Sequence, residues 1–192
     1  MMFHIGIDEA GRGPLAGPVA VGGVWARKEY PFLDVFSGVA DSKVLSPKKR
    51  EKIFTMLEEK TKEGDVRFHV ALIGADIIDT QGIAHAVRVG VREVCEKLSG
   101  EVSHTKVYLD GLLHAPDEYT QETIIRGDAT VPIISLASIA AKVVRDRVME
   151  AHATTYPLYA FEKHKGYGTK IHQDAIQKYG LCPLHRRTFV HF

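Results

Sequence analysis

Residues 3–18 constrain this chain of 192 residues more than any other stretch. An apolar run, Phe3–Ile7, leads into two adjacent carboxylates, Asp8 and Glu9, and then into a loop with three glycines, two prolines and one arginine. Apolar residues before the acids predict a buried strand, which the glycines and prolines end. Because a lone buried carboxylate is very costly, the two acids must face solvent, be protonated or hold a cation. The end of this strand is therefore the first candidate for a functional site.

Composition sets the wider bounds. The length suits one sizeable domain with a small appendage, and 45% hydrophobic residues are enough for a core. With 25 basic and 24 acidic residues, the net charge of +1 says nothing about a polyanionic partner. Cys95 and Cys182 lack metal-type spacing, which favours a reducing compartment. No apolar run reaches the roughly 18–20 residues of a membrane span, and no signal peptide is evident. We therefore expect a cytoplasmic protein without membrane association.

Later segments alternate between strand and helix patterns, which predicts an α/β fold. The loop after the first strand is too short for a helical crossover, so the first two strands should be antiparallel neighbours. The predicted strands are Phe3–Asp8, Val19–Ala26, Val66–Gly74, Thr105–Gly111 and Glu122–Asp128. The predicted helices are Lys48–Lys62, with Ser46 as N-cap and Pro47 at its start, Ile77–Leu98 and Pro132–Met149. From Ala151 onward we expect a helical appendage with a loop at Lys163–Thr169.

Three predicted strand ends carry an acid beside a glycine. They bear Asp8 with Glu9, Asp110, and Asp128. Neighbouring strand ends meet at one edge of an open α/β sheet, where sites are usually found. Four converging carboxylates would repel one another unless divalent cations neutralised them, and oxygen ligands suit Mg²⁺ or Mn²⁺. Two such ions about 4 Å apart can activate water and stabilise the leaving oxygen of a phosphodiester.

Each acid is, alternatively, a solvated strand end, an interpretation that three occurrences beside glycine make less attractive. One geometric condition also applies. Successive strand residues point to opposite faces, so Asp8 and Glu9 share a metal site only if the strand is already turning at Glu9.

The glycine-rich loop allows two further interpretations. Gly11–Ala16 matches a loose dinucleotide-binding pattern, Gly-x-Gly-x-x-Ala, which would indicate a nicotinamide-dependent oxidoreductase. Pro14 and the strand-like residues that follow argue against that function, because a helix should begin there. Alternatively, the loop is a tight hairpin with a surface arginine. In a ligand-binding loop, glycines let the backbone approach closely, and Arg12 offers a fork of donors to a phosphate.

A second basic segment lies near the C-terminus. Lys163–Lys170 places Tyr167 between glycines in a cluster of lysines, which suits phosphate contacts and stacking on a sugar or base. Such a loop is also common on ordinary solvated surfaces. Ser42 with Lys43 and the pair Arg186–Arg187 would extend the basic track. Asp146 is expected to form a surface ion pair.

Motifs spread over almost the whole chain resemble the ribonuclease HII family in its bacterial form. The opening motif is Gly6–Val19, and the second is Asp41–Ser46. The others follow in family order: Leu109-Asp110-Gly111, Gly127-Asp128-Ala129, Ala137–Val143, Arg145-Asp146-Arg147, His164–Thr169 and His185–Phe189. The departures are Leu112, where the family often has asparagine, Val44 and Leu136, and none of them touches the four acids.

The resemblance implies a ribonuclease H-like mixed sheet flanked by helices, with a catalytic domain at 1–150 and a helical segment at 151–192 that completes the substrate groove. It implies a metal-dependent endonuclease that cuts RNA in RNA–DNA hybrids and at single ribonucleotides in duplex DNA, as in ribonucleotide excision during replication and repair. The implied metal ligands and catalytic residues are Asp8, Glu9, Asp110 and Asp128.

The resemblance also assigns the substrate contacts. Gly11, Arg12 and Gly13 would sense the 2′-OH and the scissile phosphate, and Tyr167 would pack against the deoxyribose on the DNA side. Reading the 2′-OH is how a protein separates RNA from DNA. Ser42 and Lys43 complete the predicted substrate-binding set. We expect a monomer. A catalytically silent hybrid-binding module is the remaining alternative, which the full set of acids argues against.

Overall fold

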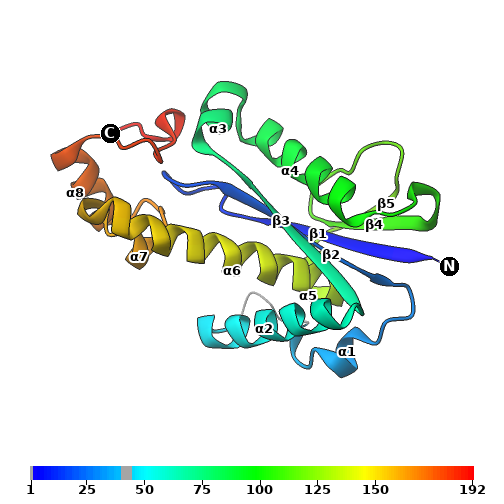
Figure 1. Ribbon diagram of the computed structural model, residues 1–192. Helices are drawn as coiled ribbons and strands as arrows, with labels where there is room; N and C mark the ends of the chain where they lie inside the picture. The colour runs from blue at the N-terminus through cyan, green and yellow to red at the C-terminus, as the bar shows by residue number, and fades with distance from the viewer. Residues whose placement is uncertain (1, 40–44) are drawn as a thin grey trace.

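A five-stranded mixed sheet forms the centre of the protein (Figure 1). The computed structural model describes residues 2–39 and 45–192. Strand order across the sheet is β3-β2-β1-β4-β5. The strands are β1 (Phe3–Ala10), β2 (Val19–Arg27), β3 (Val66–Ile73), β4 (Thr105–Asp110) and β5 (Thr120–Ile124).

The directions of the strands bring three carboxyl-terminal strand ends to one edge of the sheet. β1 pairs antiparallel with β2, as the short connection predicts, and β2 pairs antiparallel with β3. β1 and β4 are parallel, with Ile7 opposite Leu109, and β4 and β5 are parallel as well. The carboxyl ends of β1, β4 and β5 therefore lie at the same edge, where the sequence places its acids.

The glycine-rich loop comprises Gly11–Pro18, and the segment that follows it is a strand. β2 starts at Val19 and pairs with β1 along its length. A dinucleotide fingerprint requires a helix at this point, whose N-terminus binds the pyrophosphate. The structure thus removes the basis for the oxidoreductase alternative.

Eight α-helices and three short 3₁₀ segments are found in the described residues. The α-helices are α1 (Phe32–Val35), α2 (Pro47–Glu63), α3 (Ala75–Gln81), α4 (Ile83–Leu98), α5 (Gly127–Thr130), α6 (Pro132–Thr155), α7 (Phe161–His164) and α8 (Lys170–Tyr179). The 3₁₀ segments are η2 (Val102–His104), η3 (Pro157–Tyr159) and η4 (Arg187–Phe189). Ser46 caps α2 as predicted, accepting a hydrogen bond from the Lys49 N–H at 3.4 Å. The sequence did not predict α1.

The prediction of a single helix over Ile77–Leu98 is wrong, because two helices occupy this region. The helix is interrupted at Gly82, whose φ of 83° lies in the left-handed region that favours glycine. Gly90, in contrast, stays helical inside α4. A Cβ there would lie 2.6 Å from Val21 Cγ2, so this glycine lets α4 approach the sheet closely.

Helices cover both faces of the sheet. α3 and α4 lie on one face, and α2 and α6 lie on the other (Figure 1). α6 runs unusually close to the strands because Gly6 and Gly22 have no side chain. A Cβ at Gly6 would lie 2.5 Å from the Ile133 carbonyl carbon, and one at Gly22 would lie 2.3 Å from the Ala137 oxygen. These contacts fix α6 across β1, which carries Asp8 and Glu9, and across its neighbour β2.

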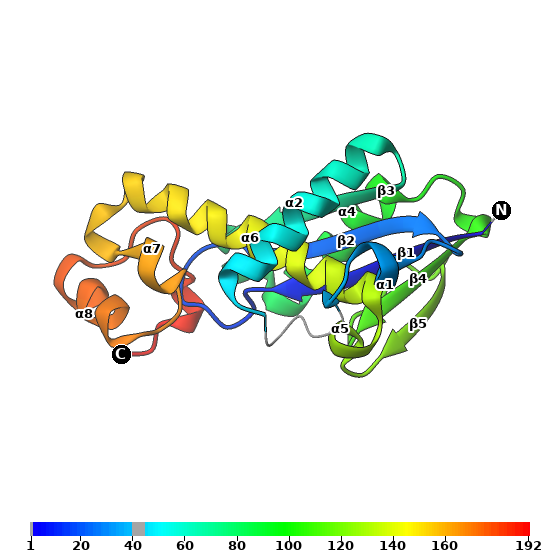
Figure 2. The same cartoon turned by 90° about the horizontal axis from the view of Figure 1, so that it is seen from below.

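Residues 156–192, here the C-terminal unit, form a helical group beyond one end of the sheet (Figure 2). Figures 1 and 2 both show the glycine-rich loop reaching toward it. Its small core includes Tyr159 and Phe161, together with Ala16 from the loop and Met149 from α6. α6 passes through residue 150 without a break, and the division at 150/151 stays a prediction. Among the described residues, no helix combines the length and apolarity needed to cross a bilayer.

Candidate active site

The first two acids lie on a strand that continues past them. β1 keeps regular pairing with β2 through Ala10, so the strand does not turn at Glu9, and the condition stated above for a metal site shared by Asp8 and Glu9 is not met by the pairing. Asp8 is 6% exposed and accepts a hydrogen bond from the Glu9 N–H at 2.8 Å. The Glu9 carboxylate accepts from Arg12 Nη1 at 3.1 Å. Ser138 on α6 hydrogen-bonds Asp8 and lines a hollow together with Glu9.

The other two acids come from the parallel side of the sheet. Asp110 is the last residue of β4, next to β1, as predicted. Asp128 was predicted at the end of a strand, and that placement is wrong, since β5 ends at Ile124 and Asp128 lies in the short helix α5. The chain turns there through Arg126, at φ 57°. The turn brings the Asp128 N–H to 3.2 Å from Asp110 Oδ1, and the Asp128 side chain is fully buried.

Asp8 carries the electrostatic signature of this edge. Its pKa is raised from the usual 3.8 to about 7, chiefly by burial and in addition by the nearby charges of Glu9 and Asp110. A hydrogen bond from Ser138 acts in the opposite direction. A buried carboxyl group therefore lies close to two further carboxylates near the ends of β1 and β4. Strongly shifted pKa values of this kind are typical of functional sites.

These four acids, here the carboxylate edge, suit a hard divalent cation by their chemistry. All their side-chain donors are oxygens, which Mg²⁺ and Mn²⁺ prefer, and a bound cation would offset the repulsion felt by Asp8. Within residues 2–39 and 45–192, however, no three acid, histidine or cysteine side chains stand in a ready-made cluster for one ion. The structure brings the acids together pairwise, Asp8 with Glu9 and with Asp110, and Asp110 with Asp128.

The glycine-rich loop lies directly beside the carboxylate edge. Gly11 is buried at φ 85°, and a Cβ there would lie 2.0 Å from Arg145 Nε, so only glycine fits. Arg12 and Gly13 are exposed, and nothing lies within 4 Å of the position a Cβ would take at Gly13. Open backbone at this point permits the close ligand approach that the sequence predicts.

Two buried arginines hold the loop, and the sequence did not identify either in this role. Arg186 donates to the carbonyl oxygens of Gly11, Arg12 and Gly17 at 2.7, 2.8 and 2.9 Å. Arg145 donates to those of Pro18 and Ala16 at 2.9 and 3.2 Å.

Arg186 was predicted to extend a basic surface track. That placement is wrong, because the side chain is fully buried. Burial, helped by the charge of Arg145, lowers the pKa of Arg186 to about 9, so it remains protonated at neutral pH. Only its place in the His185–Phe189 motif could have drawn attention to it.

Tyr167 comes to the same place from the C-terminal unit. Its ring is 42% exposed, and Lys142 Nζ lies 5.7 Å from the ring centroid. Tyr167, Glu9, Gly11 and Lys142 line one hollow of about 320 Å³, which Ala10, Arg50, Ser138 and Ile139 complete. The predicted sugar-packing residue and the predicted loop thus share a cavity with one of the acids.

A relay of neutral histidines fixes the backbone of Tyr167. The Tyr167 carbonyl accepts from His172 Nδ1 at 3.0 Å, and His172 Nε2 shares a 3.0 Å hydrogen bond with His185 Nε2. Because the Cys182 N–H donates to His185 Nδ1 at 2.9 Å, the donors and acceptors match only if both rings are neutral. Burial is the main cause that lowers the pKa of His172, to about 4.

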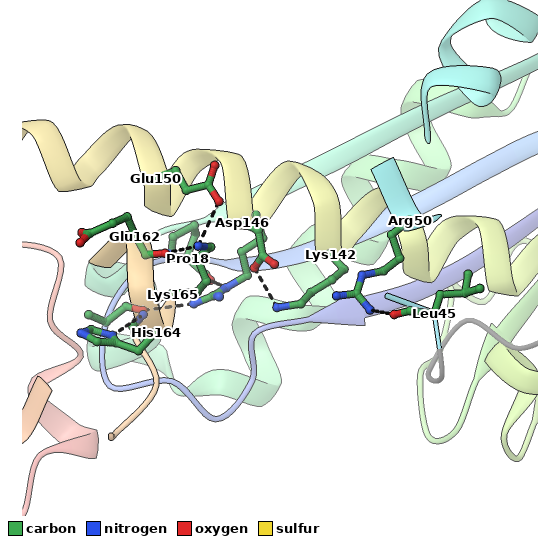
Figure 3. A network of polar contacts seen from close by, with 12 residues as sticks. Pro18, Leu45, Arg50, Lys142, Asp146, Glu150, Glu162, His164 and Lys165 are labelled. Atoms are coloured by element: carbon green, nitrogen blue, oxygen red, sulfur yellow. Dashed lines mark hydrogen bonds and ion pairs between the residues drawn. The ribbon is translucent and has the colours of Figure 1, made fainter. Parts of the chain in front are cut away.

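Polar contacts along α6 and α2 border the hollow (Figure 3). Lys142 Nζ pairs with Asp146 at 2.8 Å, which confirms the ion pair predicted for Asp146. Arg50 Nη1 donates to the Leu45 carbonyl oxygen at 2.6 Å. The predicted substrate residues Ser42 and Lys43 lie outside the described residues.

The architecture is that of the ribonuclease H-like α/β nucleases. It superimposes on the crystal structure of ribonuclease H2 from Pyrococcus horikoshii OT3 with a TM-score of 0.77 at 27% identity, covering 97% of this chain and 93% of that one. The family model described as ribonuclease HII matches residues 5–192. The chain therefore belongs to the ribonuclease HII family and is a metal-dependent endoribonuclease.

Individual relatives agree over nearly the full length. The chain is 44% identical to the ribonuclease HII of Caldicellulosiruptor bescii over 189 residues, 98% of this chain and 86% of that protein. It is also 44% identical to the ribonuclease HII of Aliarcobacter butzleri over 184 residues, 96% of this chain and 88% of that protein.

Proposed function

We propose that this protein cleaves RNA in RNA–DNA hybrids and at single ribonucleotides embedded in duplex DNA. Hydrolysis at the phosphate 5′ to the ribonucleotide would leave a 3′-hydroxyl and a 5′-phosphate. The observation that carries the proposal is that Glu9 of the carboxylate edge, Gly11 of the glycine-rich loop and Tyr167 line one hollow, while Asp8, Asp110 and Asp128 are linked pairwise to one another and to Glu9. Each element supplies one requirement: charge for metal binding, backbone for the 2′-OH, and a ring for the neighbouring sugar.

Asp8, Glu9, Asp110 and Asp128 are the proposed metal ligands. The proposed cofactor is Mg²⁺ or Mn²⁺, with two ions per site, and these ions would lower the pKa of bound water and offset charge on the scissile phosphate. The carboxylates hold and orient this assembly, and no side chain forms a covalent intermediate. Burial of Asp8 and Asp128 excludes water from one side of the edge, which strengthens electrostatic interactions there.

Substrate recognition falls to neutral and basic groups around the acids. The exposed backbone of Arg12 and Gly13, beside buried Gly11, is proposed to contact the 2′-OH and the scissile phosphate. Tyr167 packs against the deoxyribose on the DNA side. Ser42 and Lys43 are proposed to contact the backbone of the duplex. We further propose a monomeric, cytoplasmic enzyme.

Cleavage-site mapping on a duplex with one ribonucleotide tests this function. With Mg²⁺ or Mn²⁺ we expect a single cut on the 5′ side of the ribonucleotide, with a 3′-hydroxyl on the upstream product, and no cut in the presence of chelator. An all-DNA duplex of the same sequence is the control. A cut on the 3′ side, a cyclic phosphate end, or cutting that survives chelation would contradict the two-metal hydrolysis.

A further inference from the structure

Arg186 is buried in a way that a purely structural arginine does not require. Its guanidinium has no exposed surface, and in the described part of the chain no carboxylate pairs with it. Its hydrogen bonds go to three backbone carbonyls of the glycine-rich loop, at Gly11, Arg12 and Gly17. Burying an unpaired charge is costly. This cost suggests that the geometry which Arg186 imposes on the glycine-rich loop has a function.

The geometry acts on two particular peptide units. In a trans peptide the C=O and N–H bonds point in opposite directions, and the chain has no cis peptide among its described residues. The peptide whose carbonyl is at Gly11 carries the N–H of Arg12, and the one with the carbonyl of Arg12 carries the N–H of Gly13. Since Arg186 holds both carbonyls from the inside, both N–H groups point away from it.

Nothing else in the described structure engages those two donors. Neither the Arg12 N–H nor the Gly13 N–H donates a hydrogen bond to a described residue. Both residues are exposed, and the space next to Gly13 is open. A hydrogen bond to a cationic donor also polarises a peptide group, which makes its N–H a stronger donor.

We infer that Arg186 is the positioning residue for ribonucleotide recognition, holding the Arg12 and Gly13 amides toward the 2′-OH and phosphate of the substrate. The inference rests on the proposed function, because that function makes the loop the sensor of the ribonucleotide. Arg186 does not touch substrate. Its planar fork reaches two adjacent carbonyls at once, and a lysine ammonium in its place lacks that fixed fork.

Backbone hydrogen bonds from the C-terminal unit also hold the glycine-rich loop in place. The Arg186 N–H donates to the Leu15 carbonyl at 2.8 Å, and Leu15 N–H donates to the Gly166 carbonyl at 2.8 Å. Gly166 precedes Tyr167, so one short segment ties the loop and the tyrosine together. Arg186 therefore sets the loop relative to Tyr167 as well as its internal shape.

Binding without cleavage tests the inference. Fluorescence anisotropy in chelator compares a duplex with one ribonucleotide against the all-DNA duplex of the same sequence, for wild type, Arg186→Lys, Arg186→Gln and the control Arg88→Gln. Arg88 is exposed on α4 and far from the loop in sequence. We expect a roughly tenfold loss of the wild-type preference in Arg186→Gln, at least threefold in Arg186→Lys, and none in the control. A merely structural role would lower the folded fraction and change both affinities equally.

NMR of the free protein gives a second readout that needs no substrate. The amide signals of Arg12 and Gly13 should shift in Arg186→Lys, while amides in β3 stay in place. If Arg186→Gln fails to fold, Arg186→Lys decides. Wild-type preference and unmoved loop amides in Arg186→Lys would overturn the inference. If wild type shows no preference for the ribonucleotide, the proposed function fails instead, and the loop amides alone decide whether Arg186 positions the backbone.

Discussion

The carboxylate edge buries an acidic group, whereas the C-terminal unit buries basic groups, and burial shifts their pKa values in opposite directions. At the edge, burial and like charges raise the pKa of Asp8 to about 7. In the C-terminal unit, burial lowers the pKa of His172 to about 4 and that of Arg186 to about 9. At the edge, Asp8 is buried beside two further carboxylates, Glu9 and Asp110, whereas the buried groups of the C-terminal unit are neutral or bonded to carbonyls. The comparison teaches that the acidic edge fits the cation site proposed for it, whereas the C-terminal unit is suited to holding a shape.

Removing one acid from the edge should have the largest effect. We expect Asp110→Asn to lower Mg²⁺-dependent cleavage by about a thousandfold or more, because a metal ligand controls several kcal/mol of charge stabilisation. Asp128→Asn should behave alike, and both should fold. Initial rates on a one-ribonucleotide duplex measure the loss. Asp117→Asn, with its exposed side chain, is the control and should keep wild-type activity. Full activity in either variant would remove that acid from the mechanism.

The second largest effect should be the contribution of Asp8 to the pH dependence of stability. A carboxyl whose pKa is higher in the folded state favours folding while it is protonated, and this contribution is lost as pH rises from about 4 to about 7. In metal-free protein the free energy of unfolding should therefore decline over that window, by a few kcal/mol at about 1.4 kcal/mol per pKa unit. Urea unfolding from pH 4 to 8 measures it. Asp8→Asn should flatten the decline, and parallel curves for the two proteins would refute this account of Asp8.

Within the recognition apparatus, Tyr167 should shape preference more than chemistry. Tyr167→Ala should reduce cutting at a single ribonucleotide roughly tenfold more than cutting of a long hybrid, since aromatic packing contributes about 1–3 kcal/mol. Competition between the two substrates in one reaction gives the ratio. Tyr167→Phe keeps the ring and should keep the preference. Equal losses on both substrates would count against packing on the deoxyribose.

The smallest effect is expected at the histidine relay. The neutral form of His172 stabilises the folded state above about pH 6.5, and this contribution is lost as pH falls toward 4. Protonation would set two N–H groups against each other between His172 and His185, loosening the anchor of Tyr167. Near-UV circular dichroism should change between pH 6.5 and 4 in wild type and in His104→Asn, whose histidine is exposed, but less in His172→Asn. A change of equal size in His172→Asn would place the event elsewhere.

The sequence predicts the edge better than the unit that supports it. Asp110 was placed correctly at the end of a strand, and Asp8 was placed on the correct strand although β1 continues to Ala10. An apolar strand followed by acid and glycine is a local pattern, and parallel pairing converts two such patterns into neighbours. Asp128 was assigned to a strand because α5 has only four residues, too few for periodicity to reveal. Its role as a ligand, like those of the other acids, stays a proposal.

Tertiary contacts decided what the local sequence could not. Gly82 and Gly90 both lie within the helical pattern of Ile77–Leu98, yet Gly82 interrupts the helix and Gly90 makes room for Val21. Arg186 looked like a surface cation because its partners, Gly11 and Gly17, are about 170 positions earlier in the chain. Burial of a charged side chain follows from the packing of distant segments, and composition gives no sign of it.

The isolated bridge between Ala16 and His185 has a consequence for biosynthesis. The chain emerges from the ribosome with its N-terminus first, so the acids of β1 and β4 can be in place while the recognition loop still lacks its clasp. The loop acquires that clasp only when the segment around residue 185 has been made and has returned to the start of the chain. The proposed selectivity for the substrate thus depends on a segment that is synthesised after all four proposed metal ligands.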